Sequence, residues 1–452
     1  MDRRGHSNLV VAPVLATLRL LRPMLASAAA LTAAATAGCA RLVDAVIAQD
    51  CASDPTTTSC GPTSWPTAGH SANSDPWLVG HRTVITEMRP RVLVLNFLNG
   101  NSNAQSMQAA ARQAAALAEG SRYHGYADAS APVFLSYQIA AVVDVTDRTP
   151  PSGWPHPSST LLPTAPSGEF DVLALFSAQF GELYGFADPE EPSRALSLCE
   201  LFERGTINEV WIQDGEPELR RAPLNLERKQ IYDATETAIP GGFAPCLGGG
   251  NGGCLDQIIC GVTVRLSHLD AARGPGCDLQ VRGWGIERMW DALPSLRADA
   301  LAFLNRDFDS RFGVRFDGWP AICDQTGARC VTYPTATSAT GNYADGTTWT
   351  IDSFEQGCGS TLFPPNASAR WDLTSTTAVD ARCEHFGLRD GADGGDIYEP
   401  YTAANVAAAE QAFPDCGGGW QIYWRQSMPG LGNRARNADG TATKNWWPLL
   451  FY

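Results

Sequence analysis

The chain has 452 residues, of which 44% are hydrophobic and 18% are charged, and its formal net charge at pH 7 is −15. Such an acidic surface repels nucleic acid and anionic lipid, and no basic run outside the N-terminal segment offsets it, so nucleic-acid binding is not expected. The apolar fraction and the 13 tryptophans indicate one large core or two smaller ones.

The N-terminus has the pattern of an export signal. Four arginines precede the apolar small-residue run "PMLASAAALTAAATAGC", which ends at Cys39. We expect residues 1–38 to be a lipoprotein-type signal peptide and Cys39 to be lipid-modified, although "ATA" at 35–37 would also suit ordinary secretion. The run is short for a retained spanning helix. The expected location is a bacterial outer membrane or cell surface, contacted through the lipid anchor only, or the medium.

The cysteines support export. There are 13, and lipidation of Cys39 leaves an even number for disulfide bonds in an oxidising compartment. No CxxC occurs, which argues against zinc-ribbon and thioredoxin-like sites. The expected disulfide cysteines are Cys51, Cys60, Cys199, Cys246, Cys254, Cys260, Cys277, Cys323, Cys330, Cys358, Cys383 and Cys416. Cys51 and Cys60 are close enough in sequence to pair locally, as are Cys323 and Cys330, and the rest cannot be paired from sequence.

Residues 39–87 are rich in Pro, Ser, Thr and Gly, which predicts a tether. Strands alternate with helical segments from 88 to 310, which predicts an α/β domain with a mostly parallel sheet. The elements in chain order are a strand at 91–97, a helix ending at Gly120, one or two strands at 132–145, an ambiguous segment at 170–180, a helix at 192–205, and strands at 207–215 and 261–268.

The segment 276–290, "GCDLQVRGWGIERMW", predicts a helix, and the following helical segment at 286–308 should kink at Pro294. Residues 311–452 predict an irregular, Cys/Trp-rich region packed on the first domain. The expected fold class is therefore α/β or α+β, with a mixed or mostly parallel N-terminal sheet and a disulfide-rich C-terminal half. The aromatic residues of 420–452 are either core or a platform for stacking sugars.

Three segments, "INEVWIQDG" at 207–215, "GCGSTLFPPNASARWD" at 357–372 and the C-terminal 420–452, together resemble a family of secreted bacterial and fungal proteins. The specific part is "MPGLGN" followed by "KNWWPLLFY", and the resemblance spans about 88–452. It implies a His-x-Phe-Gly-His stretch after the fourth strand and a further histidine in Cys-Gly-Asn-x-His-x-Pro-Pro-Asn. Three such nitrogens would form a zinc-peptidase-like site with an open position for water.

This chain departs from that pattern at every ligand position. "QVRGWGIERMW" stands where the histidine helix should be, and Leu362 stands where the third histidine should be, while Trp284, Pro364, Pro365 and Asn366 persist. No transition-metal site is expected. The helix is then a former metal helix, a core helix that never held metal, or part of an active site that uses other groups.

Carboxylates are the remaining candidates for catalysis. Asp214, Glu216 and Glu218 follow a strand at the edge where α/β sheets bind ligands, and Glu287 could join them. The alternative is an acidic solvated loop, with Glu287 paired to Arg282 or Arg288. We take Asp214, Glu218 and Glu287 as the catalytic candidates. Among the histidines, His268 near a strand end is the first to test.

The loop "RDGADGGDIYEP" at 389–400 offers hard oxygen ligands among glycines. Calcium prefers such donors, although the spacing is not that of an EF-hand. The candidate ligands of a structural calcium ion are Asp390, Asp393, Asp396 and Glu399. The alternative is a polar surface turn.

Two functions remain open. The chain is either an exported, disulfide-stabilised and non-catalytic protein on a peptidase-like scaffold, or a secreted peptidase-like or glycan-active hydrolase that uses carboxylates. The protein or glycan ligand is not identified by the sequence.

Overall fold

The structure is a computed structural model that describes residues 62–98, 100–146, 171–213, 225–227, 229–243, 253–254, 260–269, 274–279, 282–283, 293–304, 331–342, 348–352, 357–369, 371–391, 394–437 and 439–451. The chain divides into two compact units, Met1–Asp54 and Pro55–Tyr452, and every described residue belongs to the second. No described helix is long and apolar enough to cross a membrane.

A six-stranded sheet with the order β4-β3-β5-β10-β6-β9 organises the first half of this unit. The four strands β4, β3, β5 and β10 are parallel, and β6 is antiparallel to β10. This confirms the predicted mostly parallel sheet. The strands are β3 Arg91–Asn96, β4 Gln138–Asp144, β5 Glu209–Gln213, β6 Asn225–Glu227, β9 Gly253–Cys254 and β10 Arg265–His268.

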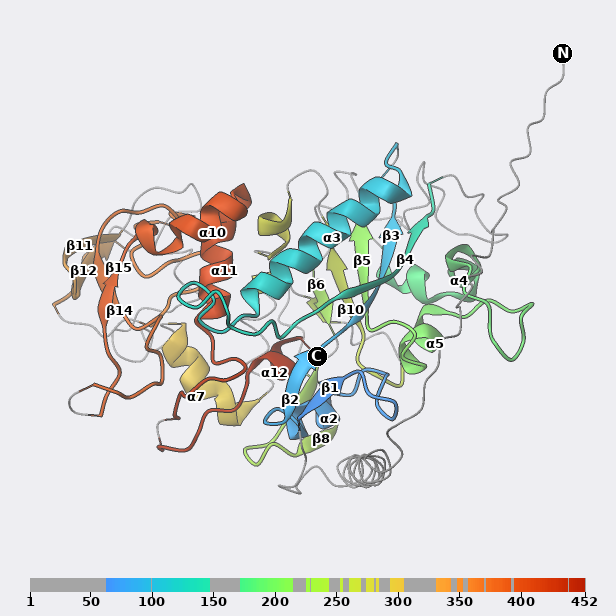
Figure 1. The fold of residues 1–452 in the computed structure, drawn as a ribbon, viewed down its shortest axis with the longest axis horizontal. Helices are drawn as coiled ribbons and strands as arrows, with labels where there is room; N and C mark the ends of the chain where they lie inside the picture. Colours follow the sequence, from blue (N-terminus) through green and yellow to red (C-terminus); the bar gives the residue numbers. More distant parts are fainter. Residues whose placement is uncertain are drawn as a thin grey trace, which may run out of the picture. The chain divides into compact units, whose positions relative to one another are not determined.

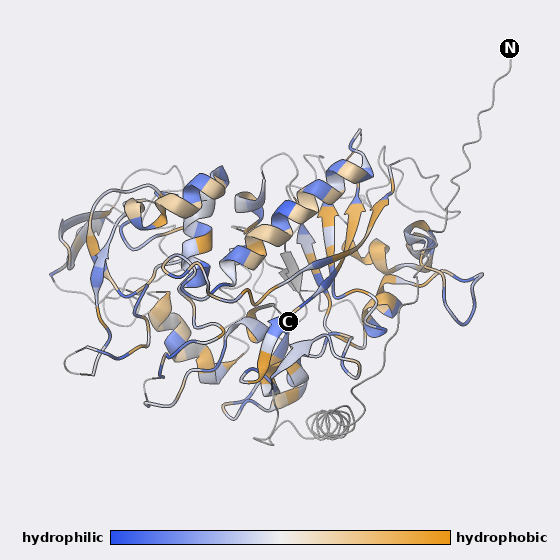
Figure 2. Ribbon diagram, in the orientation of Figure 1, coloured by the Kyte–Doolittle hydropathy of each residue, from blue (hydrophilic) through white to orange (hydrophobic). Residues whose placement is uncertain are grey.

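The central strands β3 and β5 are rich in apolar residues because both faces of the sheet are covered there. Val92, Val94 and Trp211 point to one face and belong to a core shared with α3 and the C-terminal elements. Leu93 and Leu95 point to the other face, into a second core formed with η1, α4 and α5. Figure 2 shows apolar residues concentrated on β3 and β5.

Helix α3 (Asn103–Gly120) covers the first face of the sheet (Figure 1). It begins with a capping box, in which the Ser102 hydroxyl accepts from the Gln105 backbone and the Gln105 side chain accepts from the Ser102 backbone. It ends at Gly120, where an added Cβ would lie 3.0 Å from Cδ of Arg425. The small residue therefore lets α3 pack closely against α11.

The other face is covered by η1 (Val172–Phe176), α4 (Ala178–Tyr184) and α5 (Leu198–Glu203). The ambiguous segment at 170–180 is thus helical. The helix predicted for 192–205 is shorter, because Ser197 caps it and the preceding residues form turns. Of the segment 132–145, only β4 is a full strand.

The C-terminal half consists of short elements around buried aromatic rings. Trp420, Trp424, Trp446 and Trp447 are fully buried and Tyr423 is 1% exposed, which confirms the core interpretation. The remaining elements are β7 Gln230–Tyr232, β8 Ala238–Phe243, α7 Pro294–Phe303, β11 Val331–Thr335, β12 Ser338–Asn342, β13 Thr348–Ile351, β14 Val379–Ala381, β15 Glu399–Tyr401, η5 Ala403–Val406, α10 Ala407–Ala412, η6 Asp415–Gly417, α11 Gly418–Gln426 and α12 Trp447–Phe451.

Three disulfide bonds are found in the described part of the chain: Cys199–Cys260, Cys277–Cys416 and Cys358–Cys383. They confirm the prediction of a disulfide-bonded protein. The first joins α5 to the segment before β10, and the second joins residues 139 positions apart. Of the other predicted cysteines, only Cys254, in β9, lies within the described backbone.

Two predictions are wrong. The tether was predicted to run to residue 87, but β1 (Thr63–Trp65), α2 (Asp75–Gly80) and β2 (Ile85–Met88) are folded. Trp65 and Leu78 are fully buried in the core, and this tertiary burial outweighs the local Pro/Ser composition. Helix α7 does not kink at Pro294 but begins there, because proline suits the first helical turn.

Candidate functional site

The structure leaves part of the predicted site unplaced. Asp214, Glu218 and Glu287 lie outside the described residues, as does the predicted lipidation residue Cys39. The neighbouring residue Gln213 ends β5 and is fully buried. Its side-chain amide has no hydrogen-bond partner in the described part of the chain.

Glu209, at the start of β5, is a fully buried carboxylate on the face covered by α3 and the C-terminal half. Its Oε1 accepts hydrogen bonds from Trp211 Nε1 at 2.9 Å and from Ser267 Oγ at 3.0 Å. Its Oε2 accepts from the Tyr137 hydroxyl at 2.9 Å. Strand alternation places Glu209 and Trp211 on the same face, and β10 brings Ser267 alongside.

Arg282 supplies the opposite charge. Its Nη1 lies 2.6 Å from Oε1 of Glu209, and the two side chains are 4% and 0% exposed. The guanidinium also lies 5.1 Å from the centre of the Trp211 ring and 5.9 Å from that of Tyr137, within the range of cation–π attraction. The sequence favours a pair between Glu287 and Arg282 or Arg288, and Glu287 and Arg288 lie outside the described residues.

Burial and the neighbouring charges determine whether Glu209 and Tyr137 are ionised. Burial alone would raise the pKa of Glu209, but Arg282 and then Arg265 outweigh burial and hold it below its usual value. Burial followed by the charge of Glu209 raises the pKa of Tyr137. Glu209 is therefore an anion at neutral pH, and Tyr137 is a neutral hydrogen-bond donor.

The two segments where histidines were expected, 276–290 and 357–372, meet beside this cluster through residues 282–283. A Cβ added to Gly283 would lie only 2.4 Å from Oγ1 of Thr361, so residues 282–283 pack directly on the "GCGSTLFPPN" loop. In that loop, Leu362 is 7% exposed and packs with Phe363 and Ala367. The position predicted to have lost a third histidine is an apolar contact.

Helix α11 closes the space between these segments. Trp420 Nε1 and Gln421 Nε2 donate to the carbonyl oxygen of Thr361, at 3.2 Å and 2.9 Å. Arg425 donates to the carbonyl oxygen of Leu279, and the disulfide Cys277–Cys416 anchors the same helical segment. The arrangement is a packed and charge-compensated interior.

The described members of the predicted calcium set lie against two different side chains, Arg382 and His385. Asp396 accepts from Arg382 at 2.7 Å and from the Gly387 backbone at 3.1 Å. Asp390 and Glu399 flank the ring of His385, at 3.7 Å from Nδ1 and 3.2 Å from Nε2. Asp393 is outside the described residues.

A second histidine lies near this loop. Burial, followed by the charges of His385 and Arg434, lowers the pKa of His124 to about 4. The residue has a left-handed φ of 56°, and its ring stacks on Tyr123 with centroids 3.8 Å apart. His268, by contrast, ends β10 beside Ile212 of β5.

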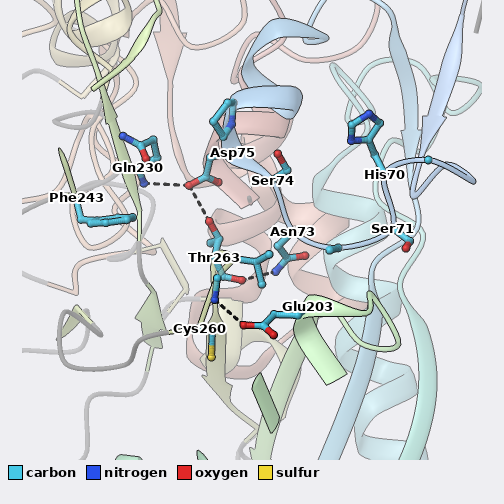
Figure 3. Close-up of a pocket in the computed structure, with 15 residues that line it drawn as sticks. His70, Ser71, Asn73, Ser74, Asp75, Glu203, Gln230, Phe243, Cys260 and Thr263 are labelled. Carbon is cyan, nitrogen blue, oxygen red and sulfur yellow. Dashed lines mark hydrogen bonds between the residues drawn. The ribbon is translucent and has the colours of Figure 1, made fainter. Parts of the chain in front are cut away.

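A cavity of about 690 Å³ was not predicted from the sequence (Figure 3). It is lined by residues 69–76 and 260–263 together with Glu203, Gln230 and Phe243. Glu203 ends α5 and residues 260–263 precede β10, so the cavity lies at the amino-terminal edge of the parallel strands. No sequence motif marks it, because its walls come from five separate segments.

Comparisons with family models, with curated proteins and with solved structures found no match to this chain. In the described part of the chain, no three His, Cys, Asp or Glu side chains are grouped so that they could hold a metal ion.

Proposed function

We propose that this chain is an exported, disulfide-stabilised protein that binds a protein or glycan ligand without catalysing a reaction. Its peptidase-like scaffold carries an internal Arg–Glu ion pair in place of a metal ion. The observation that supports this most strongly is the contact between Arg282 and Glu209, both of them buried.

Arg282 stands at a position where the resemblance predicts a metal ligand. Aligning Trp284 with the aromatic residue of His-x-Phe-Gly-His places Arg282 at the first histidine of that motif. A guanidinium stays protonated in proteins and cannot bind a metal ion through a lone pair. Leu362, at the other expected ligand position, has no donor atom. These residues therefore do not fit a three-nitrogen zinc site.

A buried carboxylate needs a positive charge nearby, which either a metal ion or a cationic side chain can provide. Arg282 provides that charge permanently and occupies the volume as well. The scaffold then keeps its electrostatic balance without a metal ion, and its function moves to its surface.

Export is supported by the three disulfide bonds, which persist in oxidising compartments. Together with the N-terminal pattern ending at Cys39, they favour a lipoprotein of the bacterial outer membrane or cell surface, or a secreted protein. A lipid anchor would be the contact with the membrane.

One observation favours the alternative, a secreted hydrolase that uses Asp214, Glu218 and Glu287. Gln213 precedes Asp214, and its amide is buried without a hydrogen-bond partner among the described residues. An unsatisfied amide costs about 1–3 kcal/mol, which a bound substrate could offset. Ligands of parallel α/β sheets bind at this carboxyl edge.

Hydrolysis assays separate the two. The purified mature protein should release no more product from fluorescein-labelled casein and 4-methylumbelliferyl glycosides than buffer does, with zinc or EDTA present. The double variant Asp214→Asn/Glu218→Gln is the matched control. Turnover that this variant abolishes would establish the hydrolase and overturn the non-catalytic proposal.

A further inference from the structure

The cavity at the amino-terminal edge of β5 and β10 has the size of a small-molecule site, which is typically about 300–1,000 Å³. Figure 3 shows its walls, with Phe243 and Gln230 on one side, His70 on the other and Glu203 between them. It is separate from the Arg282–Glu209 pair and does not depend on the function proposed above.

Three ionisable side chains line the cavity, and the first of them is fully engaged. Asp75 is 1% exposed and receives hydrogen bonds from the Gln230 backbone at 3.0 Å and from Thr263 Oγ1 at 2.9 Å. Lys229, also buried, places Nζ 3.4 Å from Oδ1 and balances the charge. Asp75 therefore holds the wall together and contributes no net charge to a ligand.

Glu203 differs, because its charge is not balanced. Its Oε1 accepts from the Gly261 backbone at 2.7 Å, and no described cation forms an ion pair with it. The adjacent Arg204 is directed to Asp188, with bonds of 2.9 Å and 3.0 Å. Glu203 is exposed, one of its carboxylate oxygens accepts from the backbone, and the other has no hydrogen bond or ion pair among the described residues.

The third group, His70, adds little positive charge. Burial, and then the neighbouring His81, lowers its pKa, so the imidazole is mostly neutral at pH 7. Its ring stacks on Trp77 at 4.8 Å, and Trp77 stacks on His81 at 4.1 Å. Among the described residues, the ionisable lining therefore carries one uncompensated negative charge.

We propose that this cavity binds an alkylammonium group, with Glu203 as the counter-ion and Phe243, Pro76 and Val262 as contacts for the aliphatic stem. The same chemistry is found in free polyamines and in the lysine side chain of a polypeptide. An amphipathic cation suits a mostly polar site that combines one carboxylate with a few apolar side chains and a ring face. Anions are repelled, and neutral analogues lose the ionic contact.

Isothermal titration with an isosteric charge series tests the assignment. The probes are cadaverine, 1,5-pentanediol and glutarate, added to the whole mature protein in 50 mM salt. Cadaverine should bind with a dissociation constant on the order of millimolar, and the diol and the diacid more weakly. Equal binding of the diol and the diamine would overturn the proposal.

Two variants localise the binding. Glu203→Gln keeps an oxygen for the Gly261 amide and removes the charge, and it should weaken cadaverine binding about fivefold. Glu182→Gln removes the same charge from an exposed position on α4 outside the cavity and should leave binding unchanged. Unchanged binding in Glu203→Gln, or an equal loss in both variants, would contradict the site.

The source of the ammonium group is distinguished with a blocked Ala-Lys-Ala peptide and its norleucine counterpart. Tighter binding of the lysine peptide than of cadaverine identifies a polypeptide ligand, and the reverse identifies a free polyamine. Equal binding of the lysine and norleucine peptides, like equal binding of the diol and the diamine, contradicts an ammonium site.

Discussion

Arg282 and Glu209 form a buried ion pair, with Nη1 2.6 Å from Oε1, between a helical segment and the first residue of the central strand β5. Desolvating two charges costs several kcal/mol each, and their attraction offsets this only with good geometry and further hydrogen bonds. Glu209 has such bonds from Tyr137, Trp211 and Ser267. We therefore expect the pair to help fix how the helical segment docks on the sheet.

Arg282→Met should lower the free energy of unfolding by about 3–5 kcal/mol, because it leaves Glu209 buried without its main counter-charge. Urea unfolding at pH 7 measures this. Arg89→Met breaks an exposed pair with Glu87 and should cost less than about 1 kcal/mol. Arg282→Met/Glu209→Gln should be more stable than Arg282→Met alone, and an additive double variant would refute the coupling.

The same pair has a defined pH dependence. In the native protein, the lowered pKa of Glu209 stabilises the fold above the unfolded-state pKa, and this contribution is lost as the pH falls through the folded-state value. In Arg282→Met, burial raises the pKa of Glu209. The carboxylate is then protonated as the pH falls, which removes the cost of burying its charge. The stability difference should therefore shrink from pH 7 to pH 4. A difference that is constant with pH would show that Glu209 does not carry it.

Gly283→Ala should destabilise the fold by about 1–3 kcal/mol, because the new methyl group would overlap Thr361, with Oγ1 at 2.4 Å and Cγ2 at 2.6 Å. Thr361→Ala in the same chain should recover part of the loss. Gly69→Ala, which meets nothing within 4 Å, is the matched control and should be nearly neutral. Urea unfolding of the native protein, Gly283→Ala, Gly283→Ala/Thr361→Ala and Gly69→Ala measures these differences. A Gly283→Ala variant as stable as Gly69→Ala would contradict the contact.

His124 should make the protein acid-sensitive. Its folded-state pKa of about 4 lies below the unfolded value of 6.5, so the unfolded chain binds the proton first. The contribution of neutral His124 to the free energy of unfolding is complete above about pH 6.5. It falls by at most about 3 kcal/mol between pH 6.5 and pH 4. His124→Asn, which tolerates the left-handed backbone, should flatten this slope. An NMR titration of His124 with a midpoint near 6.5 would contradict the assignment.

The disulfide bonds should differ in how much each contributes to the free energy of unfolding. In the loop-closure description, Cys277–Cys416 spans 139 residues and stabilises by about 5 kcal/mol, and Cys358–Cys383 spans 25 and stabilises by about 3.5 kcal/mol. Paired Cys→Ala variants, compared by urea unfolding, measure the difference. A larger loss for Cys358→Ala/Cys383→Ala would show that local packing outweighs loop length.

The parallel sheet could be predicted because its signals are local. "RVLVLN" is a continuous apolar run, and both faces of β3 are buried. The folded segment 63–88 could not be predicted, because its apolar residues are few and follow no strand or helix period, and Trp65 and Leu78 are buried in a core shared with distant elements. The composition of such a segment reports its average polarity. It does not reveal the few side chains that hold the segment in the core.

The candidate sites were harder to predict than the fold. Arg282 and Glu209 are far apart in the chain, and local spacing suggests Glu287 as the partner instead. The cavity beside Glu203 joins five segments, and an unpaired carboxylate cannot be recognised before its neighbours are known. The resemblance of 357–372 identified Leu362 as a departure from the expected ligand pattern, and the structure adds that Thr361 of the same loop packs against Gly283.

Metal analysis of the purified mature protein, after mild dialysis, tests most directly whether the Arg282–Glu209 pair stands in place of a metal ion. The account predicts far less than one zinc ion per chain, with Arg282→His as a comparison protein that regains a ligand nitrogen. One zinc ion bound per native chain would contradict it.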